Sequence, residues 1–274
     1  MPGSDRRCLM AVHAHPDDEG VFTGGVLARY GAAGVTTVLV TCTNGELGFG
    51  AGGVEAGQPG HDEAAVVATR REELERSARA LGITHLELLG FHDSGMAGWP
   101  DNDAPGSFWS TPVPEAAGRL IELIERYRPQ VVLTYDANGF YGHPDHIQAH
   151  RITMAAAEAT GLPERVLFPE IPSSWMRNFS EQLAAAGVEV PEFIEDGPDL
   201  STPDAEITAL VDCTSVVARK YEAVAAHASQ PDNAFFIGLG PELFARVFSV
   251  EAFVTGLDRT GEPPPLDDLF AGIA

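Results

Sequence analysis

Two short segments of the chain carry histidine and carboxylate side chains at the same spacing. His15 and Asp18 are three residues apart in "HAHPDDE", and His143 and His146 are three apart in "GHPDH". Two histidines and one carboxylate can hold a catalytic zinc ion and leave one coordination position for water. The spacing therefore points to a metal-dependent hydrolytic site.

Both segments also have a simpler interpretation as the starts of helices. Pro144 suits the first turn of a helix, and Asp145 suits its positive end. Either segment alone fits a capped helix start. Because the two occur together, each after an apolar run, we prefer the metal site.

Apolar runs alternate with segments of helical period from residue 8 onward, which is the pattern of βαβ units. Near-continuous apolar strands between helices predict an α/β fold, namely a Rossmann-like, mostly parallel sheet with helices on both faces. In such sheets ligands bind outside the carboxyl ends of the strands. The expected strands are 8–14, 35–43, 85–91, 130–135 and 207–213, and the expected helices are 22–33, 63–82, 114–127, 144–160 and 215–228.

We expect a single domain over residues 1–274, with a Rossmann-like core in 1–160 and substrate-side and C-terminal elements in 161–274. The stretch 172–204 is rich in proline and acidic residues, and its pattern does not define its structure. The segment 92–112 is long enough to form an active-site wall or lid.

Composition excludes several classes of protein. Forty acidic residues against seventeen basic ones give a formal net charge of −23, which argues against a broad nucleic-acid footprint. The apolar runs are too short for a membrane span, and the run after Arg7 is too short for a signal peptide. Cys8, Cys42 and Cys213 are expected to be buried free thiols. We therefore expect a cytoplasmic protein that acts on a small molecule, with self-association left open.

Five motifs together resemble one protein family. They are "AHPDDE" (14–19), "RREEL" (70–74), "DSGMAG" (93–98), "TYDANGFYGHPDH" (134–146) and "AAHASQ" (225–230). In these motifs the chain is similar to the zinc-dependent N-deacetylases of the PIG-L/LmbE type, above all to their mycothiol deacetylase and mycothiol conjugate amidase branch. The resemblance implies hydrolysis of an amide on an N-acetylglucosamine-type aminosugar.

The resemblance also implies roles for particular residues. Zinc would be bound by His15, Asp18 and His146, and Asp17 would be the general base. His143 would assist the carbonyl oxygen or the leaving amine, and we expect it to act in its protonated form. From the residues alone, Asp145 is expected to orient a metal-bound histidine. The expected substrate contacts are Arg70, Asp93 and Tyr141, the last on a mobile loop.

The chemistry of these residue types agrees with the implied roles. Zinc lowers the pKa of a bound water toward ~7, and a carboxylate beside it can take the proton. General acid–base catalysis then contributes roughly 10²–10⁴-fold, and a hydrogen-bond donor to the oxyanion contributes about 3–4 kcal/mol. Such a site is adequate for amide hydrolysis, although the sequence does not distinguish Zn²⁺ from Fe²⁺.

The sequence leaves the substrate open between three enzymes and one binding protein. "DSGMAG" looks more like the deacetylase, and Phe22 stands where the conjugate amidases have a lysine. An N-deacetylase of an aminosugar natural product is a third option, and a metal-free sugar-binding module is a fourth. The glycine-rich "GELGFGAGG" (45–53) does not fit a dinucleotide loop, because no helix follows it and the first βα turn is HPDD.

Several other side chains are weaker candidates. Histidines in apolar or helical segments are usually satisfied core residues, and Arg70 and Arg71 lie on an acid-rich helix where solvated ion pairs are the default. Aromatic side chains in the 92–112 loop could stack on a sugar or simply fix the loop. These candidates are His13, His92, His150, His227, Trp99, Phe108 and Trp109.

Overall fold

The computed structural model describes residues 7–189 and 199–274. Its described strands form one sheet in the order β3-β2-β1-β4-β5-β8-β7, with β6 paired to β5. The strands are β1 (Cys8–His13), β2 (Thr36–Thr43), β3 (His85–Phe91), β4 (Val131–Leu133), β5 (Arg165–Pro172), β6 (Ser201–Thr202), β7 (Ala209–Asp212) and β8 (Val250–Asp258).

The first five strands run parallel, β8 runs in the opposite direction, and β7 at the edge of the sheet returns to the direction of the first five. β1 pairs in parallel with both β2 and β4, and β5 continues the parallel ladder beyond β4. β8 is antiparallel to β5, and β7 is antiparallel to β8. This arrangement confirms the predicted α/β fold with a mostly parallel, Rossmann-like sheet.

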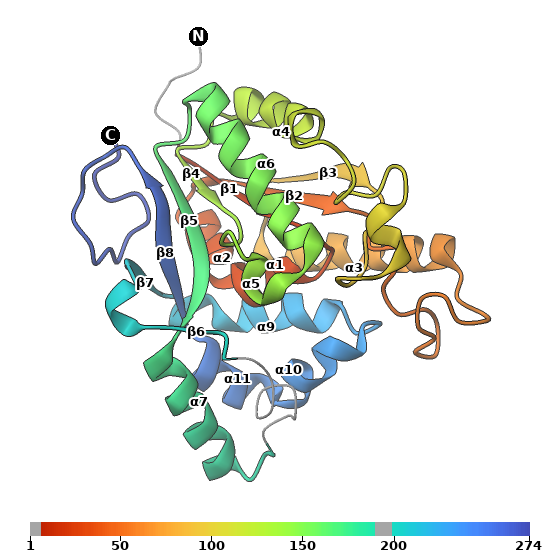
Figure 1. Ribbon diagram of the computed structural model, residues 1–274. Coiled ribbons are helices and arrows are strands. Elements are labelled where there is room, and N and C mark those ends of the chain that lie inside the picture. Colours follow the sequence, from red (N-terminus) through yellow and green to blue (C-terminus); the bar gives the residue numbers. More distant parts are fainter. Residues whose placement is uncertain (1–6, 190–198) are drawn as a thin grey trace.

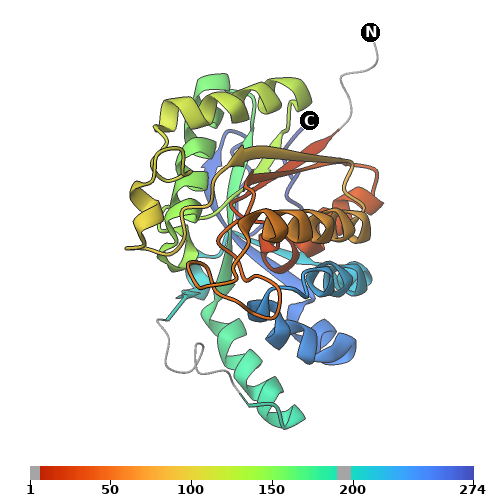
Figure 2. The ribbon, with the colours of Figure 1, turned by 90° about the vertical axis from the view of Figure 1, so that its right-hand side faces the viewer.

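Helices cover both faces of the sheet, as Figures 1 and 2 show. On one face α4 (Val113–Tyr127) packs against α6 (Pro144–Thr160). On the other face α9 (Val217–Ala226) packs against α2 (Gly24–Ala32) and α3 (Glu63–Leu81). Each face has its own apolar core, because the strand side chains alternate between the two sides.

Local sequence explains where the long helices begin and end. Asp62 caps α3 by accepting a hydrogen bond from the Ala65 backbone N–H, and Gly82 ends it in the left-handed conformation. Helix α6 has a proline in its first turn, as predicted from Pro144, and it ends at Gly161. The predicted range 144–160 for this helix is confirmed.

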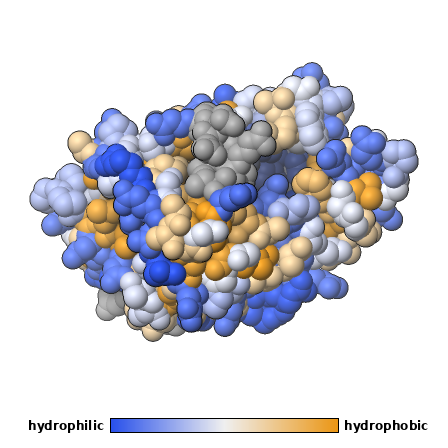
Figure 3. Space-filling view, turned by 90° about the horizontal axis from the view of Figure 1, so that it is seen from below, coloured by the Kyte–Doolittle hydropathy of each residue, from blue (hydrophilic) through white to orange (hydrophobic). Residues whose placement is uncertain are grey.

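A third group of helices lies below the sheet in Figure 1. It contains α7 (Ser173–Ala186), α10 (Ala234–Gly238) and α11 (Gly240–Phe248), which pack around a separate apolar cluster. Seen from below, apolar side chains gather on this face of the molecule (Figure 3). Helix α7 lies in the 172–204 stretch that the sequence did not define, and residues 190–198 of that stretch are outside the described part.

The sequence pattern missed or misjudged some elements. Strands β5 and β8 were not predicted. The expected helix 22–33 is α2, and the short helix α1 (Asp18–Phe22) that precedes it was not predicted. The expected strand 130–135 is shorter, because only Val131–Leu133 pair as β4. The short helix α5 (Gly139–Gly142) contains Phe140 at a φ of 64°. Within 7–189 and 199–274 we find no helix that is long and apolar enough to span a membrane.

The two histidine motifs follow the two central strands. β1 and β4 are neighbours, but β1 connects onward to β2 on one side while β4 connects through α6 to β5 on the other. Divergent connections of this kind open a crevice at the carboxyl ends of the strands. The segments after His13 and Leu133 therefore meet in that crevice.

A buried ion pair joins three elements near the sheet. The Lys220 ammonium of α9 lies 2.8 Å from a carboxylate oxygen of Glu251 on β8. The same carboxylate accepts hydrogen bonds from the backbone N–H groups of Gly25 and Val26 at the start of α2. Glu251 thus stabilises a helix N-terminus as well as the lysine.

Candidate metal centre

Three of the predicted ligands converge at the carboxyl ends of β1 and β4. Nδ1 of His15 lies 3.5 Å from Oδ2 of Asp18, and Nε2 of His146 lies 3.6 Å from Oδ1 of the same carboxylate. The two imidazole rings are 5.3 Å apart between centroids. All three side chains are buried.

Tyr135 fixes this arrangement, and the sequence analysis missed it. Its hydroxyl donates a 2.6 Å hydrogen bond to Oδ2 of Asp18 and accepts one from the Ala14 backbone N–H. Its ring stacks on His146 with 4.0 Å between centroids. Its position could have indicated this role, because Tyr135 ends the apolar run of β4 and lies within the motif of residues 134–146.

The donor set fits a metal ion of the zinc type. Both ring nitrogens of His146 are buried and lack a hydrogen-bond partner, which is costly unless something else binds them. Burial lowers the pKa of His146 to about 3, so the ring is neutral and has a free lone pair. Zinc bonds of 2.0–2.2 Å place tetrahedral ligand atoms roughly 3.4 Å apart, close to the observed separations.

Asp145 holds the outer nitrogen of His15. Oδ2 of Asp145 lies 3.3 Å from Nε2 of His15 and accepts a hydrogen bond from the Ser94 backbone N–H. Burial disfavours the charged His15 ring, but Asp93 and Asp145 outweigh it and raise its pKa well above the usual value. Metal binding at Nδ1 would replace the proton there, while the proton on Nε2 stays directed toward Asp145, as in other metal-bound imidazoles.

His143 lies beside the ligands but is already engaged through one nitrogen. Its Nδ1 accepts a hydrogen bond from the Asp145 backbone N–H and so caps α6. Burial, together with His15 and His146, lowers the pKa of His143 to about 2. The lowered pKa favours a neutral ring with its proton on Nε2, whereas the sequence led us to expect a protonated His143. Ring nitrogens of His143, His15 and His146 come within 4.8 Å of one another.

Asp17 has an unusual backbone and an unusual carboxyl group. Its φ of 119° lies in a region that non-glycine residues rarely adopt, and such strain costs about 1–3 kcal/mol. Burial raises the pKa of Asp17 to about 6, although Arg70 opposes the shift. A carboxylate that titrates near neutrality suits a general base.

Arg70 is buried against the turn that carries Asp17. One guanidinium nitrogen lies 3.0 Å from the Asp17 carboxylate and donates to the Pro16 carbonyl, and another donates to the Gly45 carbonyl. A side chain at Gly45 would collide with the guanidinium, so glycine is required there. Arg70 is thus not on a solvated helix face, whereas Arg71 pairs with Glu75 at the surface as expected by default.

Asp93 and Tyr141 differ in their access to a substrate. Asp93 is buried, and its Oδ1 accepts a hydrogen bond from the Gly95 N–H and lies 3.7 Å from Nε2 of His15. The backbone N–H of Asp93 donates to Glu46 in the glycine-rich loop. Tyr141 is 43% exposed, and its ring centroid is 5.1 Å from that of His146. Tyr141 therefore lies between the cluster and solvent.

The weaker candidates mostly have structural partners. His13 bonds to Thr23, and His150 bonds to the Tyr135 carbonyl. Phe108 is buried and stacks on Phe91, so it fixes the 92–112 loop. The other residues with structural contacts are His92, which bonds to the Asp93 carbonyl, and Trp109, which lies under Arg151.

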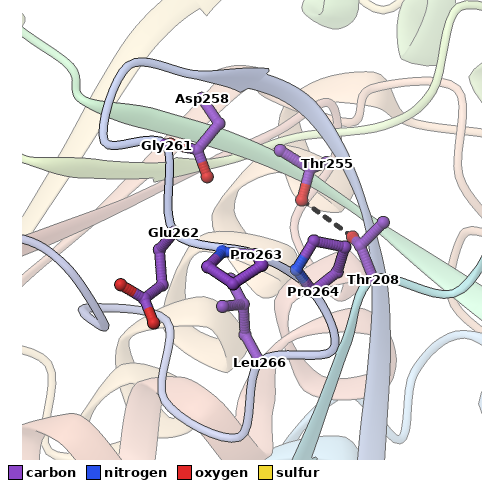
Figure 4. Close-up of a pocket in the computed structure, with 8 residues that line it drawn as sticks. All are labelled: Thr208, Thr255, Asp258, Gly261, Glu262, Pro263, Pro264 and Leu266. Atoms are coloured by element: carbon purple, nitrogen blue, oxygen red, sulfur yellow. Dashed lines mark hydrogen bonds between the residues drawn. The ribbon is translucent and has the colours of Figure 1, made fainter.

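A cavity of about 280 Å³ lies elsewhere, against the C-terminal loop (Figure 4). Its walls include the hydroxyls of Thr208 and Thr255, which bond to each other, and the prolines of residues 263–264. It contains none of the residues of the histidine–aspartate cluster. The chemistry of the cluster, rather than cavity size, locates the candidate site.

The fold and the site together define an LmbE-like α/β protein with a buried histidine–aspartate centre at the crevice of its sheet. The family described as GlcNAc-PI de-N-acetylase, PIG-L, matches residues 10–157, which include both histidine motifs. The chain belongs to this family.

Known proteins resemble the chain over nearly its whole length. A 1D-myo-inositol 2-acetamido-2-deoxy-alpha-D-glucopyranoside deacetylase from Salinispora arenicola is 39% identical, covering 98% of this chain and 92% of the relative. The N,N'-diacetylchitobiose deacetylase of Pyrococcus horikoshii has the same fold, with a TM-score of 0.58, 20% identity, and coverage of 92% of this chain and 84% of that one. A 4-carboxy-2-hydroxymuconate hydratase from Pseudomonas putida matches with a TM-score of 0.61 and 22% identity, covering 94% and 100%. Likeness of fold alone therefore does not fix the reaction.

The strained backbone of Asp17 leads to a stability prediction. Asp17→Gly and Asp17→Ala both remove the carboxylate, but only glycine adopts a φ of 119° without strain. We expect the glycine variant to be more stable by about 1 kcal/mol in urea unfolding. At exposed Glu72, in the middle of α3, the order should be reversed, because glycine destabilises a helix interior. Equal stabilities at position 17 would show that its backbone is not strained.

Proposed function

We propose that the chain is a zinc-dependent deacetylase that hydrolyses the N-acetyl amide of an inositol-linked 2-acetamido-2-deoxyglucoside. The observation that carries this proposal is the placement of Asp17, a carboxylate with a raised pKa, beside His15, Asp18 and His146. The choice of aminosugar is supported by the deacetylase from Salinispora arenicola, because that relative is named for this substrate.

In this proposal His15, Asp18 and His146 hold the zinc ion. When bound there, zinc polarises the amide carbonyl and lowers the pKa of a water molecule toward ~7. Asp145 keeps the Nε2 proton of His15 directed away from the metal, and Tyr135 holds Asp18. A fourth protein ligand would close the position that the substrate needs, so His143 is left free.

Asp17 acts as the general base in this scheme. It takes a proton from the attacking water as the oxygen bonds to the acetyl carbon, and it can return a proton to the nitrogen as the C–N bond breaks. The products are acetate and the free amine. Arg70 keeps Asp17 ionised near neutral pH, because its positive charge lowers the pKa that burial raises. We therefore place Arg70 with the base rather than with the sugar.

His143 would stabilise the oxyanion as a neutral donor. The Asp145 N–H occupies its Nδ1, so its Nε2–H is the group that can reach the carbonyl oxygen. Removal of one such donor typically lowers kcat by about 10²–10³-fold. Asp93 and Tyr141 remain the proposed contacts to the sugar, from the wall and from the mouth of the site.

The direct test measures acetate release from the inositol-linked N-acetylglucosaminide. Dialysis against a strong chelator should abolish the activity, and added Zn²⁺ should restore it. A panel of other N-acetylglucosaminides and of mycothiol S-conjugates separates this function from a conjugate amidase or a natural-product deacetylase. Turnover by protein that elemental analysis shows to be metal-free would contradict the mechanism, and tight sugar binding without turnover would indicate a binding module.

The two histidines of "GHPDH" should behave differently when each is changed to alanine. His146→Ala should lose both zinc and activity, because it removes a ligand. His143→Ala should keep nearly stoichiometric zinc while kcat falls about 10²–10³-fold, because only an oxyanion donor is lost. Metal content and turnover of the two purified variants decide the matter. If His143→Ala is the variant without zinc, the roles are exchanged.

Replacement of Arg70 should change the pH dependence of the reaction. Its positive charge lowers the pKa of Asp17, so Arg70→Gln should raise that pKa and move the acid limb of kcat/KM to higher pH. Arg70→Lys retains the charge and should keep the limb near its original position. Because zinc is present in all three proteins, a difference between their pH profiles reports a change in the pKa of Asp17. A raised KM with an unchanged pH profile would instead place Arg70 against the sugar.

A further inference from the structure

A second buried acid–histidine pair lies behind the turn that carries Asp17. Glu19 and His227 are both fully buried, and Nε2 of His227 lies 2.7 Å from Oε1 of Glu19. The two residues are 208 positions apart in the sequence. Burial of a carboxylate at this depth requires partners, and Ser77 of α3 is another one, donating its hydroxyl to the same oxygen.

The other oxygen of Glu19 reaches the strained residue itself. Oε2 accepts a 3.0 Å hydrogen bond from the backbone N–H of Asp17, whose φ is 119°. Arg70 binds the same turn through the Asp17 carboxylate and the Pro16 carbonyl. A strained backbone conformation persists only where the surrounding contacts hold it. Glu19 provides such a contact, because it accepts the hydrogen bond from the strained peptide N–H.

We propose that Glu19 and His227 form a buried clamp that positions the general base. In this role His227, with Ser77, fixes the Glu19 carboxylate, and Glu19 fixes the Asp17 peptide so that the Asp17 side chain faces the zinc ligands. Both are positioning residues, since neither touches the reacting atoms. The catalytic part of the proposal rests on the proposed deacetylase function, whereas the positional part is a statement about the backbone.

The chain offers a matched control for the clamp. Glu251 is also a buried carboxylate that accepts backbone N–H groups and pairs with a buried cation, Lys220. Its hydrogen bonds go to the start of α2 and not to the His15–Glu19 turn. Glu251→Ala should therefore lower overall stability as Glu19→Ala does, without moving Asp17.

The first experiment measures the position of Asp17 without any substrate. Amide hydrogen exchange is followed by NMR in wild type, Glu19→Ala, His227→Leu and Glu251→Ala, under conditions where all are folded. The Asp17 amide should exchange at least about tenfold faster in the first two variants and at the wild-type rate in the third. If Glu19→Ala does not fold, Glu19→Gln and His227→Leu provide the same comparison. Unchanged Asp17 exchange in the folded clamp variants overturns the proposal.

The second experiment measures turnover and asks whether the clamp acts through Asp17. His227→Leu should lower kcat by about 10–100-fold with KM and zinc content unchanged, because small misplacements of a catalytic group are costly. His227→Gln retains a donor for Glu19 and should recover most of the rate. In an Asp17→Ala background, His227→Leu should cause no further loss, since the base is already gone. A full additional loss there, or an increase in KM alone, overturns the positioning role.

The two experiments separate the two proposals. If wild type releases no acetate but the Asp17 amide still exchanges faster in the clamp variants, the proposed function fails and the clamp stands. If wild type is active while the clamp variants keep both their exchange rates and their kcat, the clamp fails and the function stands.

Discussion

Burial of several carboxylates in one crevice is the constraint on which the rest of the site depends. Asp18, Asp93 and Asp145 are buried together. Within the described ranges, the one arginine that forms an ion pair with an acidic side chain of this centre is Arg70, which pairs with Asp17. Ionised groups at such depth need donors, and the fold supplies the N–H groups of His15, Ser94 and Gly95 and the Tyr135 hydroxyl. The excess negative charge that remains is the electrostatic environment in which a divalent cation is favoured.

This constraint explains why segments distant in sequence meet at the crevice. The 92–112 loop supplies backbone donors to Asp93 and Asp145, and the glycine-rich loop supplies the Gly45 carbonyl to Arg70 and the Glu46 carboxylate to the Asp93 N–H. Both loops follow parallel strands whose carboxyl ends share one edge of the sheet. Their apparent irregularity therefore reflects the need to satisfy buried charge, which regular structure alone would not do.

The sequence predicted the parallel half of the fold and the metal motifs, because both depend on local pattern. β5 was missed because Arg165 and two prolines interrupt its apolar run, yet Arg165 is buried against Asp258 and the Leu269 carbonyl. The contacts of Asp17 with Arg70, and of Glu19 with His227, join residues far apart in the chain. Residue spacing does not predict contacts of this kind. The motifs therefore indicated the types of ligand but not the side chains that hold those ligands in position. The protonation state of His143 likewise depends on burial and on its N-cap hydrogen bond, which local spacing does not contain.

The ion pair of Lys220 with Glu251 has a consequence for chemical modification. Lys220 is the only lysine among the 274 residues, and it is 2% exposed, with its ammonium group against Glu251 of β8 and the ring of Phe248 in α11. Reagents and enzymes that modify lysine side chains, such as active esters or acetyltransferases, thus find no exposed ε-amino group while the protein is folded. Modification of Lys220 requires the opening of α9, so the rate of modification measures how often this helix unfolds locally.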